Sequence, residues 1–465
     1  MSIEPIGIFV ICIGLICLLL GNAATAIALT IASVFGSAAA LFIGAANVQP
    51  GHVMLGFLAI GMMTRRQEAK AFVQALSPGE PGFWLALLVI YGVAGAYFYP
   101  RLMGGSTQII PLGTTIYDPG STVPLVPGSS NITQSVYMVG NLFCFAMTAS
   151  VASRPSGFAT IVTGLLGYAV FNTLFALLDI TTFASGLQDL LGFMRNARYT
   201  LHTDDQIAGM KRIVGSFTEA SSFARSCLGV LGFVGTLWLA GYRPLLTGLL
   251  ALTSAVLVVL STSSTGLVGA PVILFLLYAT GVMLCTQQVA PRYALIATVM
   301  VPLLVLASGL VVAIDVDLFN TVYNYVDLVV LGKADSDSGV TRHSWNVVAL
   351  QNFLDSGGLG VGLGTVRTSS LLVSLVASVG IPGTFFYAAF VYGAFFSQGT
   401  AGGGIYRISR IAARNGCLGL MVGDVLVSPA IDQGLAFYVL AALASSHPER
   451  NARFLRVQSP VGAQI

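Results

Sequence analysis

The sequence is poor in charge. Asp, Glu, Lys and Arg make up 8% of its 465 residues, whereas soluble globular proteins carry about 25%. Hydrophobic residues make up 55%, and the mean hydropathy is +0.86. A chain with so few charges cannot cover a water-facing surface, so we expect lipid to be its main solvent. The composition therefore predicts an all-α, polytopic membrane protein, a helical bundle that forms a single transmembrane domain over residues 1–465.

The sequence also lacks the clusters that bind metals or nucleic acids. Its four histidines are scattered, and its six cysteines lie in apolar runs without the paired spacing of metal ligands. We expect no metal, no other cofactor and no disulfide. The net charge of +3 is small and thinly spread, which argues against a nucleic-acid partner. The first apolar run, 5–20, lacks the basic start and the small-residue cleavage site of a signal peptide, so we interpret it as a retained span.

Apolar runs recur along the whole chain. A transmembrane helix needs about 20 mostly apolar residues, and the runs predict 12 to 14 such helices. The candidate spans are 5–20, 22–47, 53–64, 83–100, 135–153, 157–181, 219–241, 244–262, 265–286, 292–314, 368–397, 415–430 and 433–446.

The short basic loops set the orientation. The basic residues of these loops all fall on one side of the 13 spans. They are Arg65, Arg66 and Lys70, three later single arginines, and the arginines near both ends of the last two spans. Basic loops face the cytoplasm, so the N-terminus is expected outside. Three polar stretches then lie on the outer face: 101–134, 182–218 and 315–367. The last of them is a candidate active-site loop, because it carries basic residues against the trend.

One outer stretch runs from Arg212 through Gly215 to Glu219 and directly into an apolar run. Glu219 would lie at the start of a helix, where the helix dipole favours an anion. Arg225 lies about two turns deeper, where a charge is usually paired. A helix cap with an interfacial anchor explains this pattern as well as a functional site does.

The second outer motif joins Arg342-His343-Ser344-Trp345 to a glycine run over 357–364 that ends near Arg367. No Gly-Lys-Ser/Thr follows, so this is not a nucleotide-binding loop. Glycine runs are more often tight turns than phosphate cradles. The flanking arginines favour a phosphate ligand, because the planar guanidinium group can donate two hydrogen bonds to one phosphate. We therefore expect Arg212, Arg342 and Arg367 to form an outward-facing basic pocket for a lipid phosphate or diphosphate.

These two stretches resemble the O-antigen polymerase and ligase superfamily, and the resemblance covers about 60 residues in detail. The matching elements are Arg212-x-x-Gly215-x-Phe217-x-Glu219, Arg342-x-x-Trp345, Asn352-Phe353, Gly360-Val361-Gly362-Leu363-Gly364, Arg367 and Gly380-Ile381-Pro382-Gly383. The arrangement of many spans with a large outer loop late in the chain is also similar, and Arg367 follows the glycine run as in the exopolysaccharide-type polymerases.

The resemblance implies a metal-independent, GT-C-like glycosyltransferase of the bacterial inner membrane, with its large late loop and active site facing the periplasm. It would join polysaccharide repeat units linked to undecaprenyl diphosphate, with inversion and release of the carrier. The lipid-linked oligosaccharide would be both donor and acceptor, and a chain-length regulator protein is an expected partner. Arg212, Arg342, Arg367, Gly362 and Gly364 would bind the diphosphate.

Two departures from the family pattern affect the catalytic assignment. No histidine follows the glycine run, which favours a polymerase over a ligase and leaves the general base open. The run Ser261-Thr262-Ser263-Ser264-Thr265 stands where the family often has an arginine. Glu219 is the first catalytic candidate because it lies in a matched motif, and His343 is the second. For His343, an exposed loop histidine without a role is an equally good explanation.

Three alternatives stay open at this point. A ligase that transfers a finished glycan to a lipid or protein would differ mainly in the shape of its acceptor site. A flippase or transporter of lipid-linked oligosaccharide would need charges within several helices, whereas Arg225 is the only clear one. A scaffold without catalytic function would leave the basic outer residues unexplained.

Overall fold

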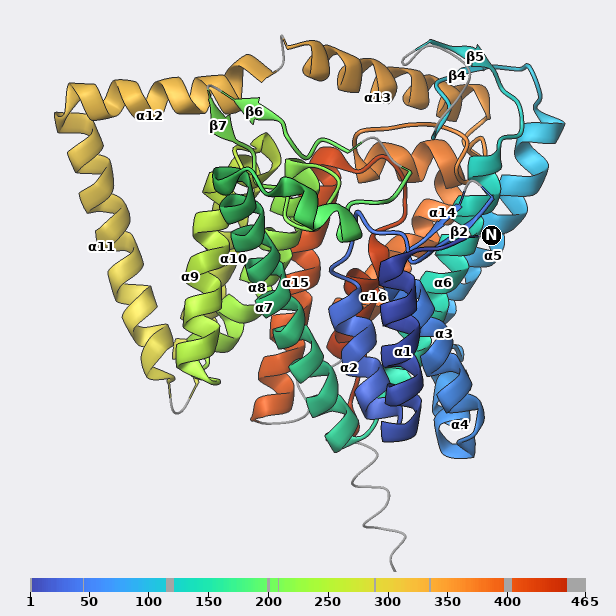
Figure 1. The fold of residues 1–465 in the computed structure, drawn as a ribbon, viewed down its shortest axis with the longest axis horizontal. Coiled ribbons are helices and arrows are strands. Elements are labelled where there is room, and N and C mark those ends of the chain that lie inside the picture. The colour runs from blue at the N-terminus through green and yellow to red at the C-terminus, as the bar shows by residue number, and fades with distance from the viewer. Residues whose placement is uncertain are drawn as a thin grey trace, which may run out of the picture.

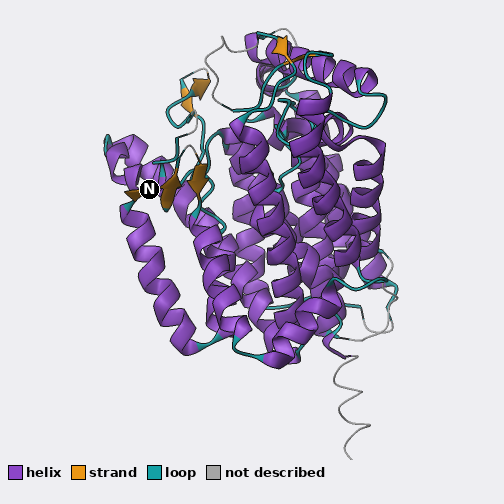
Figure 2. Ribbon diagram, turned by 90° about the vertical axis from the view of Figure 1, so that its right-hand side faces the viewer, coloured by secondary structure: helices purple, strands orange, loops and turns teal. Residues whose placement is uncertain are grey.

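The computed structural model describes residues 2–44, 46–113, 121–198, 201–207, 209–287, 290–333, 336–396 and 404–449. This part of the chain forms a helical bundle with a few short strands gathered toward one end (Figures 1 and 2). The helices that run along the bundle are α1 (Pro5–Leu20), α2 (Asn22–Ala32), α3 (Pro50–Met63), α5 (Pro81–Leu102), α6 (Ser129–Ala152), α7 (Pro155–Ser185), α8 (Ala220–Leu239), α9 (Pro244–Leu260), α10 (Ser264–Cys285), α11 (Arg292–Ile314), α14 (Leu371–Phe395), α15 (Ile405–Val427) and α16 (Gly434–Ser445).

The remaining elements lie at the ends of the bundle. The helices are α4 (Arg66–Ala75), η1 (Gln188–Met194), α12 (Val316–Val329), η2 (Leu331–Lys333) and α13 (Asp337–Asp355). The strands form three small antiparallel sheets: β1 (Ser2–Ile3), β2 (Leu41–Ile43) and β3 (Ala46–Val48); β4 (Gln108–Ile109) and β5 (Val123–Pro124); β6 (Gln206–Ile207) and β7 (Met210–Lys211).

Seven of the described helices are long and apolar enough to cross a membrane: α5, α6, α7, α8, α10, α11 and α14. The prediction of an all-α bundle is therefore confirmed, and the apolar helices support a membrane protein. The other predicted spans coincide with the shorter apolar helices α1, α2, α3, α9 and α16, and with α15, whose first turns carry Arg407 and Arg410.

The prediction of one continuous span over 22–47 is wrong. Helix α2 ends at Ala32, and the chain then turns and enters β2. Non-helical backbone is tolerated at membrane depth only where protein satisfies its polar groups. Here the segment 194–216 does so: the amide of Ser37 donates to the carbonyl of Ser216 (3.0 Å), and Asn196 exchanges two hydrogen bonds with the backbone of Ala39 (2.9 and 3.0 Å).

The three polar stretches predicted to lie outside gather at one end of the bundle, above the helix ends (Figure 1). The stretch 315–367 is not an irregular loop, because it contains α12 and α13, which lie across this end. Asn352 on α13 donates to the hydroxyl of Thr107 (2.9 Å) and to the carbonyl of Gln108 (2.7 Å), so the first stretch holds the third in place.

The glycine run inserts its backbone against a break in α14. Gly380 has φ 59° and ψ −162°, and Pro382 follows two residues later. Because proline has no N–H, the carbonyl of Ser378 lacks its helical donor. The amide of Gly362 takes that place at 3.1 Å. The run is therefore joined to the helix, and the chain after it starts from a fixed position.

Gly364 makes the closest approach in this run. It has φ 76°, and a Cβ built there would lie 2.5 Å from the carbonyl oxygen of Ser130. We expect Gly364→Ala to destabilise the protein by about 3 kcal/mol or more, because overpacking adds to the cost of a left-handed alanine. Gly357→Ala is the matched control, since Gly357 has φ 60° but no atom within 4 Å of its Cβ position. Thermal unfolding in lipid nanodiscs measures both; equal losses for the two variants would contradict the packing argument.

Candidate functional site

Arg212 enters the site on a segment fixed by a buried carboxylate. Asp179, near the end of α7, pairs with Arg195 (2.7 Å) and Lys211 (3.3 Å). Its second oxygen accepts from the amides of Val214 (2.8 Å) and Gly215 (3.0 Å). The chain on both sides of Arg212 is therefore held at the upper end of α7, and the guanidinium of Arg212 lies 3.8 Å from Asp205.

Glu219 lies directly before α8 and connects Arg212 with α13. It is the N-cap residue of α8, and its carboxylate accepts a hydrogen bond from Ser221. The same carboxylate lies 3.6 Å from the guanidinium of Arg342 on α13. Both partners are partly exposed, at 29% for Glu219 and 28% for Arg342, so they border the solvent.

Arg367 reaches the same place from the end of the glycine run. Its amide donates to the carbonyl of Ile110 (2.9 Å). Asn346 on α13 accepts from the amide of Ser369 (2.8 Å), which holds α13 over this segment. The guanidinium of Arg367 then lies over the ring of Trp345, 4.1 Å from its centroid, a favourable arrangement for a cation.

The structure brings the three predicted arginines together. Arg212 and Arg367 each interact electrostatically with Arg342 and with Glu219. Lys333 in η2 joins them, because it interacts with Arg212 and Arg342. We call these four cations, with Glu219, Asp205 and Trp345, the basic cluster. Its four cations face two carboxylates, which leaves two positive charges in excess.

Three buried donors of this cluster have no acceptor among the described residues. Burial lowers the pKa values of Arg212, Arg367 and Lys333, with the neighbouring cations adding to the effect. Among the described residues, the buried Nε atoms of Arg212 and Arg367 and the Nε1 of Trp345 have no hydrogen-bond partner. Buried donors are normally paired, so the cluster is suited to an anion with several oxygens, such as a diphosphate.

The structure separates the two predicted catalytic residues. Glu219 lies within the basic cluster, where Ser221 and Arg342 occupy its carboxylate. His343 is exposed on α13, on the face turned away from Trp345. Gly362 and Gly364 are buried, and they pack against α5 and α6 respectively. The geometry therefore gives these glycines a packing role and does not support their predicted diphosphate contacts.

Arg225 is not the only charge within the helices. Asp424 on α15 is buried and accepts two hydrogen bonds from the guanidinium of Arg225, one of them at 2.8 Å. The carbonyl of Gln433 accepts a third at 2.7 Å. In the sequence, a single Asp within the apolar run 415–430 is the feature that could have indicated this buried ion pair. Asp424 and Asp179 are each paired with cations of the protein: the first pair joins α8 to α15, and the second joins α7 to the segment 195–215.

The run of hydroxyl residues that replaces an arginine forms the turn between α9 and α10. Thr262 and Ser263 are buried, and their hydroxyls have no partner among the described residues. Thr262 also has φ 47°, which is strained for a β-branched residue. The turn carries hydroxyl donors but no charge, so it does not replace the missing guanidinium.

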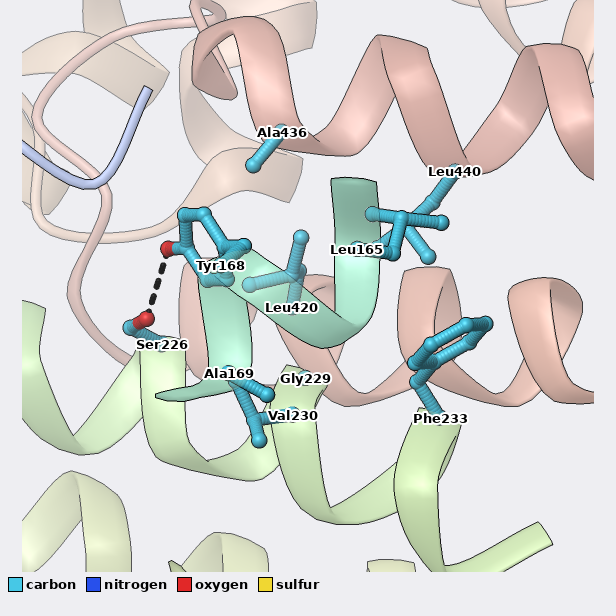
Figure 3. Close-up of a pocket in the computed structure, with 10 residues that line it drawn as sticks. All are labelled: Leu165, Tyr168, Ala169, Ser226, Gly229, Val230, Phe233, Leu420, Ala436 and Leu440. Carbon is cyan, nitrogen blue, oxygen red and sulfur yellow. Dashed lines mark hydrogen bonds between the residues drawn. The ribbon is translucent and has the colours of Figure 1, made fainter. Parts of the chain in front are cut away.

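A small apolar pocket lies elsewhere, between α7, α8, α15 and α16 (Figure 3). Tyr168 and Ser226 share a hydrogen bond of 2.7 Å at its wall. The other lining residues are Leu165, Ala169, Gly229, Val230, Phe233, Leu420, Ala436 and Leu440. Without a charged group it offers no chemistry, and we assign it to helix packing.

Comparison of the sequence with models of known protein families and with curated proteins finds no match.

Lys333 provides a pH test of the basic cluster. Burial and the neighbouring arginines lower its pKa below the ordinary 10.5, and a bound diphosphate would raise it again. Binding is therefore strongest below the pKa of the free protein and weakens as the pH rises toward the pKa of the complex. We expect the affinity for a short-chain sugar diphosphate ester to fall at alkaline pH, and Lys333→Met to remove most of that fall. Titration calorimetry at several pH values measures both; identical slopes for the two proteins would exclude Lys333 from the site.

Proposed function

We propose that the protein is a polymerase of polysaccharide repeat units linked to undecaprenyl diphosphate. It would be a GT-C-like enzyme with 12 to 14 spans in the bacterial inner membrane, and the end that carries the basic cluster would face the periplasm. The observation that carries the proposal is the basic cluster itself. It has two excess positive charges and buried donors without a partner in the described part of the chain, and a diphosphate diester carries two negative charges.

The surroundings of the cluster suit a ligand that is anchored in the bilayer. Helix α11 is apolar and exposed along almost its whole length, with Ala294 as its buried residue. It contacts the bundle at its lower end, where Tyr293 packs on Trp238 with 5.7 Å between ring centroids, and diverges toward the end that carries α12 (Figure 1). This helix therefore offers an apolar surface to lipid chains below α12 (Figure 1).

Helix α12 supports the same geometry. Its apolar residues, among them Phe319, Val322 and Val326, lie on one face and remain exposed. An amphipathic helix with an uncovered apolar face suits the membrane surface. The cluster would then lie level with lipid head groups, where the diphosphate of a polyprenyl carrier is held by its tail.

In the proposed reaction, Arg212, Arg342, Arg367 and Lys333 hold the diphosphate of the growing chain. A hydroxyl of a second lipid-linked repeat attacks the anomeric carbon, the bond to the phosphate oxygen breaks, and the cations stabilise the charge that develops on the leaving group. Inversion at the anomeric carbon and release of undecaprenyl diphosphate follow from this single displacement. Chain length would be set with a regulator protein.

The proposal is tested by removing the protein from cells that have no other copy of this activity. We expect cells without it to accumulate single lipid-linked repeats and to lose long polysaccharide on a gel. Long chains that stay on the lipid carrier would instead indicate a ligase. Repeats trapped at the cytoplasmic face would indicate a flippase and overturn the proposal.

A further inference from the structure

A second polar site lies beside the basic cluster, around the turn 428–433 that joins α15 to α16. Thr368, the residue after Arg367, donates through its amide to the carbonyl of Pro429 (3.4 Å) and through its hydroxyl to Ser428 (3.2 Å). On its other side the turn is bound by Arg225, which donates to Gln433. The turn is thus fixed between Thr368, which follows Arg367 of the basic cluster, and Arg225 on α8.

Asp432 is the reactive group of this turn. One of its carboxylate oxygens, Oδ1, accepts from the amide side chain of Asn141 (2.8 Å) and from the amide of Gly434 (2.9 Å). The other oxygen has no partner among the described residues, and the side chain is partly exposed. The carboxylate is therefore oriented by two donors and retains one oxygen that can accept a proton.

Further polar atoms without partners surround Asp432. Both ring nitrogens of His52 on α3 are buried and unpaired within the described chain, and so is the Oδ1 of Asn141. The ring of His52 packs against Tyr137, with 5.2 Å between centroids. Asp432 interacts electrostatically with His52. An imidazole, an amide, a carboxylate and an aromatic ring together suit a hydroxyl-rich ligand.

The charge of this second site argues against a phosphate. The other charged or titratable groups that interact with Asp432 are Arg225, Asp424 and Tyr438. Arg225 is already bound to Asp424 through two hydrogen bonds, so no cation in the described part of the chain is free to balance an anion at Asp432. The site is therefore suited to a neutral sugar, in contrast to the basic cluster.

We propose that the Asp432 turn binds the acceptor sugar and that Asp432 is the general base of the transfer. This inference rests on the proposed function and supplies the base that Glu219, engaged by Arg342, does not. The free oxygen of Asp432 takes the proton of the acceptor hydroxyl as its oxygen bonds to the anomeric carbon. The bond from that carbon to the phosphate oxygen breaks, and its electron pair leaves with the diphosphate held by the basic cluster.

Single-turnover transfer from a short-chain lipid-linked repeat to a soluble acceptor oligosaccharide tests this role in liposomes that contain the full chain. We expect Asp432→Asn to slow transfer by about 100-fold or more, to leave donor binding within twofold of wild type and to abolish the acid limb of the pH–rate profile. Asp432→Glu should restore part of the rate. His52→Ala should raise the acceptor concentration needed for half-maximal rate.

Three results would overturn the role of Asp432. Transfer by Asp432→Asn within threefold of wild type excludes it as the base, and an unchanged acid limb does the same. A parallel loss of donor binding assigns it a structural role. If Asp432→Asn does not fold, a folded Asp432→Glu variant that binds donor but transfers no sugar excludes the base role, because it keeps a carboxylate. Failure of the wild-type protein to form any glycosidic bond would instead overturn the proposed function itself, together with this inference.

Discussion

Arg342→Ala is expected to abolish long polysaccharide and to leave single lipid-linked repeats. Arg342 contacts Glu219 from α13 and interacts with both Arg212 and Arg367, so it lies at the centre of the basic cluster. Loss of one preorganised donor to a developing charge costs about 100- to 1,000-fold in rate. Arg342→Lys should recover little of that, because an ammonium cannot make the planar two-point contact.

The neighbouring residue supplies the control for this variant. His343→Ala changes an exposed side chain at the next position of the same helix, and we expect normal chain lengths at equal membrane abundance. Chain length on a gel, with the abundance of each variant measured by immunoblot, distinguishes them. Normal polymer from Arg342→Ala, or equal losses for both variants, would be inconsistent with a diphosphate site at the basic cluster.

Asp179→Ala is expected to cause the largest loss of stability. Its carboxylate is fully buried and pairs with Arg195 and Lys211, so the variant takes the anionic partner from two cations and the acceptor from two amides. Removing one partner of a buried ion pair costs about 3–5 kcal/mol. The segment that holds Arg212 would lose its attachment to α7, and polymer formation would stop.

Asp189→Ala is the matched control, because Asp189 is an exposed carboxylate in η1 of the same polar stretch. Thermal unfolding in nanodiscs should separate the two variants by several kcal/mol. Asp179→Asn should fall between them, because it keeps the polar volume but removes the charge. If Asp179→Ala melted like Asp189→Ala, the buried carboxylate would not be what fixes this segment.

The elements of the fold could be predicted wherever hydropathy alone decides the structure. Helix α11 coincides with the predicted run 292–314, and α1 with 5–20. The prediction failed over 22–47, where the residues are apolar but their backbone is bonded to the segment 194–216. That partner lies about 160 residues away in the chain, and no local pattern indicates such a contact.

The candidate site could be predicted in part for a similar reason. Arg212, Arg342 and Arg367 were recognisable as basic residues against the charge trend, and the structure brings them together. Lys333 and Asp432 belong to no matched motif, and their positions follow from tertiary contacts. The glycines at 362 and 364 looked like a ligand cradle because sequence does not distinguish a backbone that approaches a ligand from one that approaches another helix.

Bond formation by the purified protein is the most direct test of the proposed function. The protein is reconstituted in liposomes with a lipid-linked repeat unit as the only substrate, and both polymer and free undecaprenyl diphosphate are quantified over time. Our proposal predicts a ladder of polymers, with one undecaprenyl diphosphate released for each bond formed and with no added metal. Movement of the lipid-linked repeat across the bilayer without any new glycosidic bond would contradict it and identify a transporter.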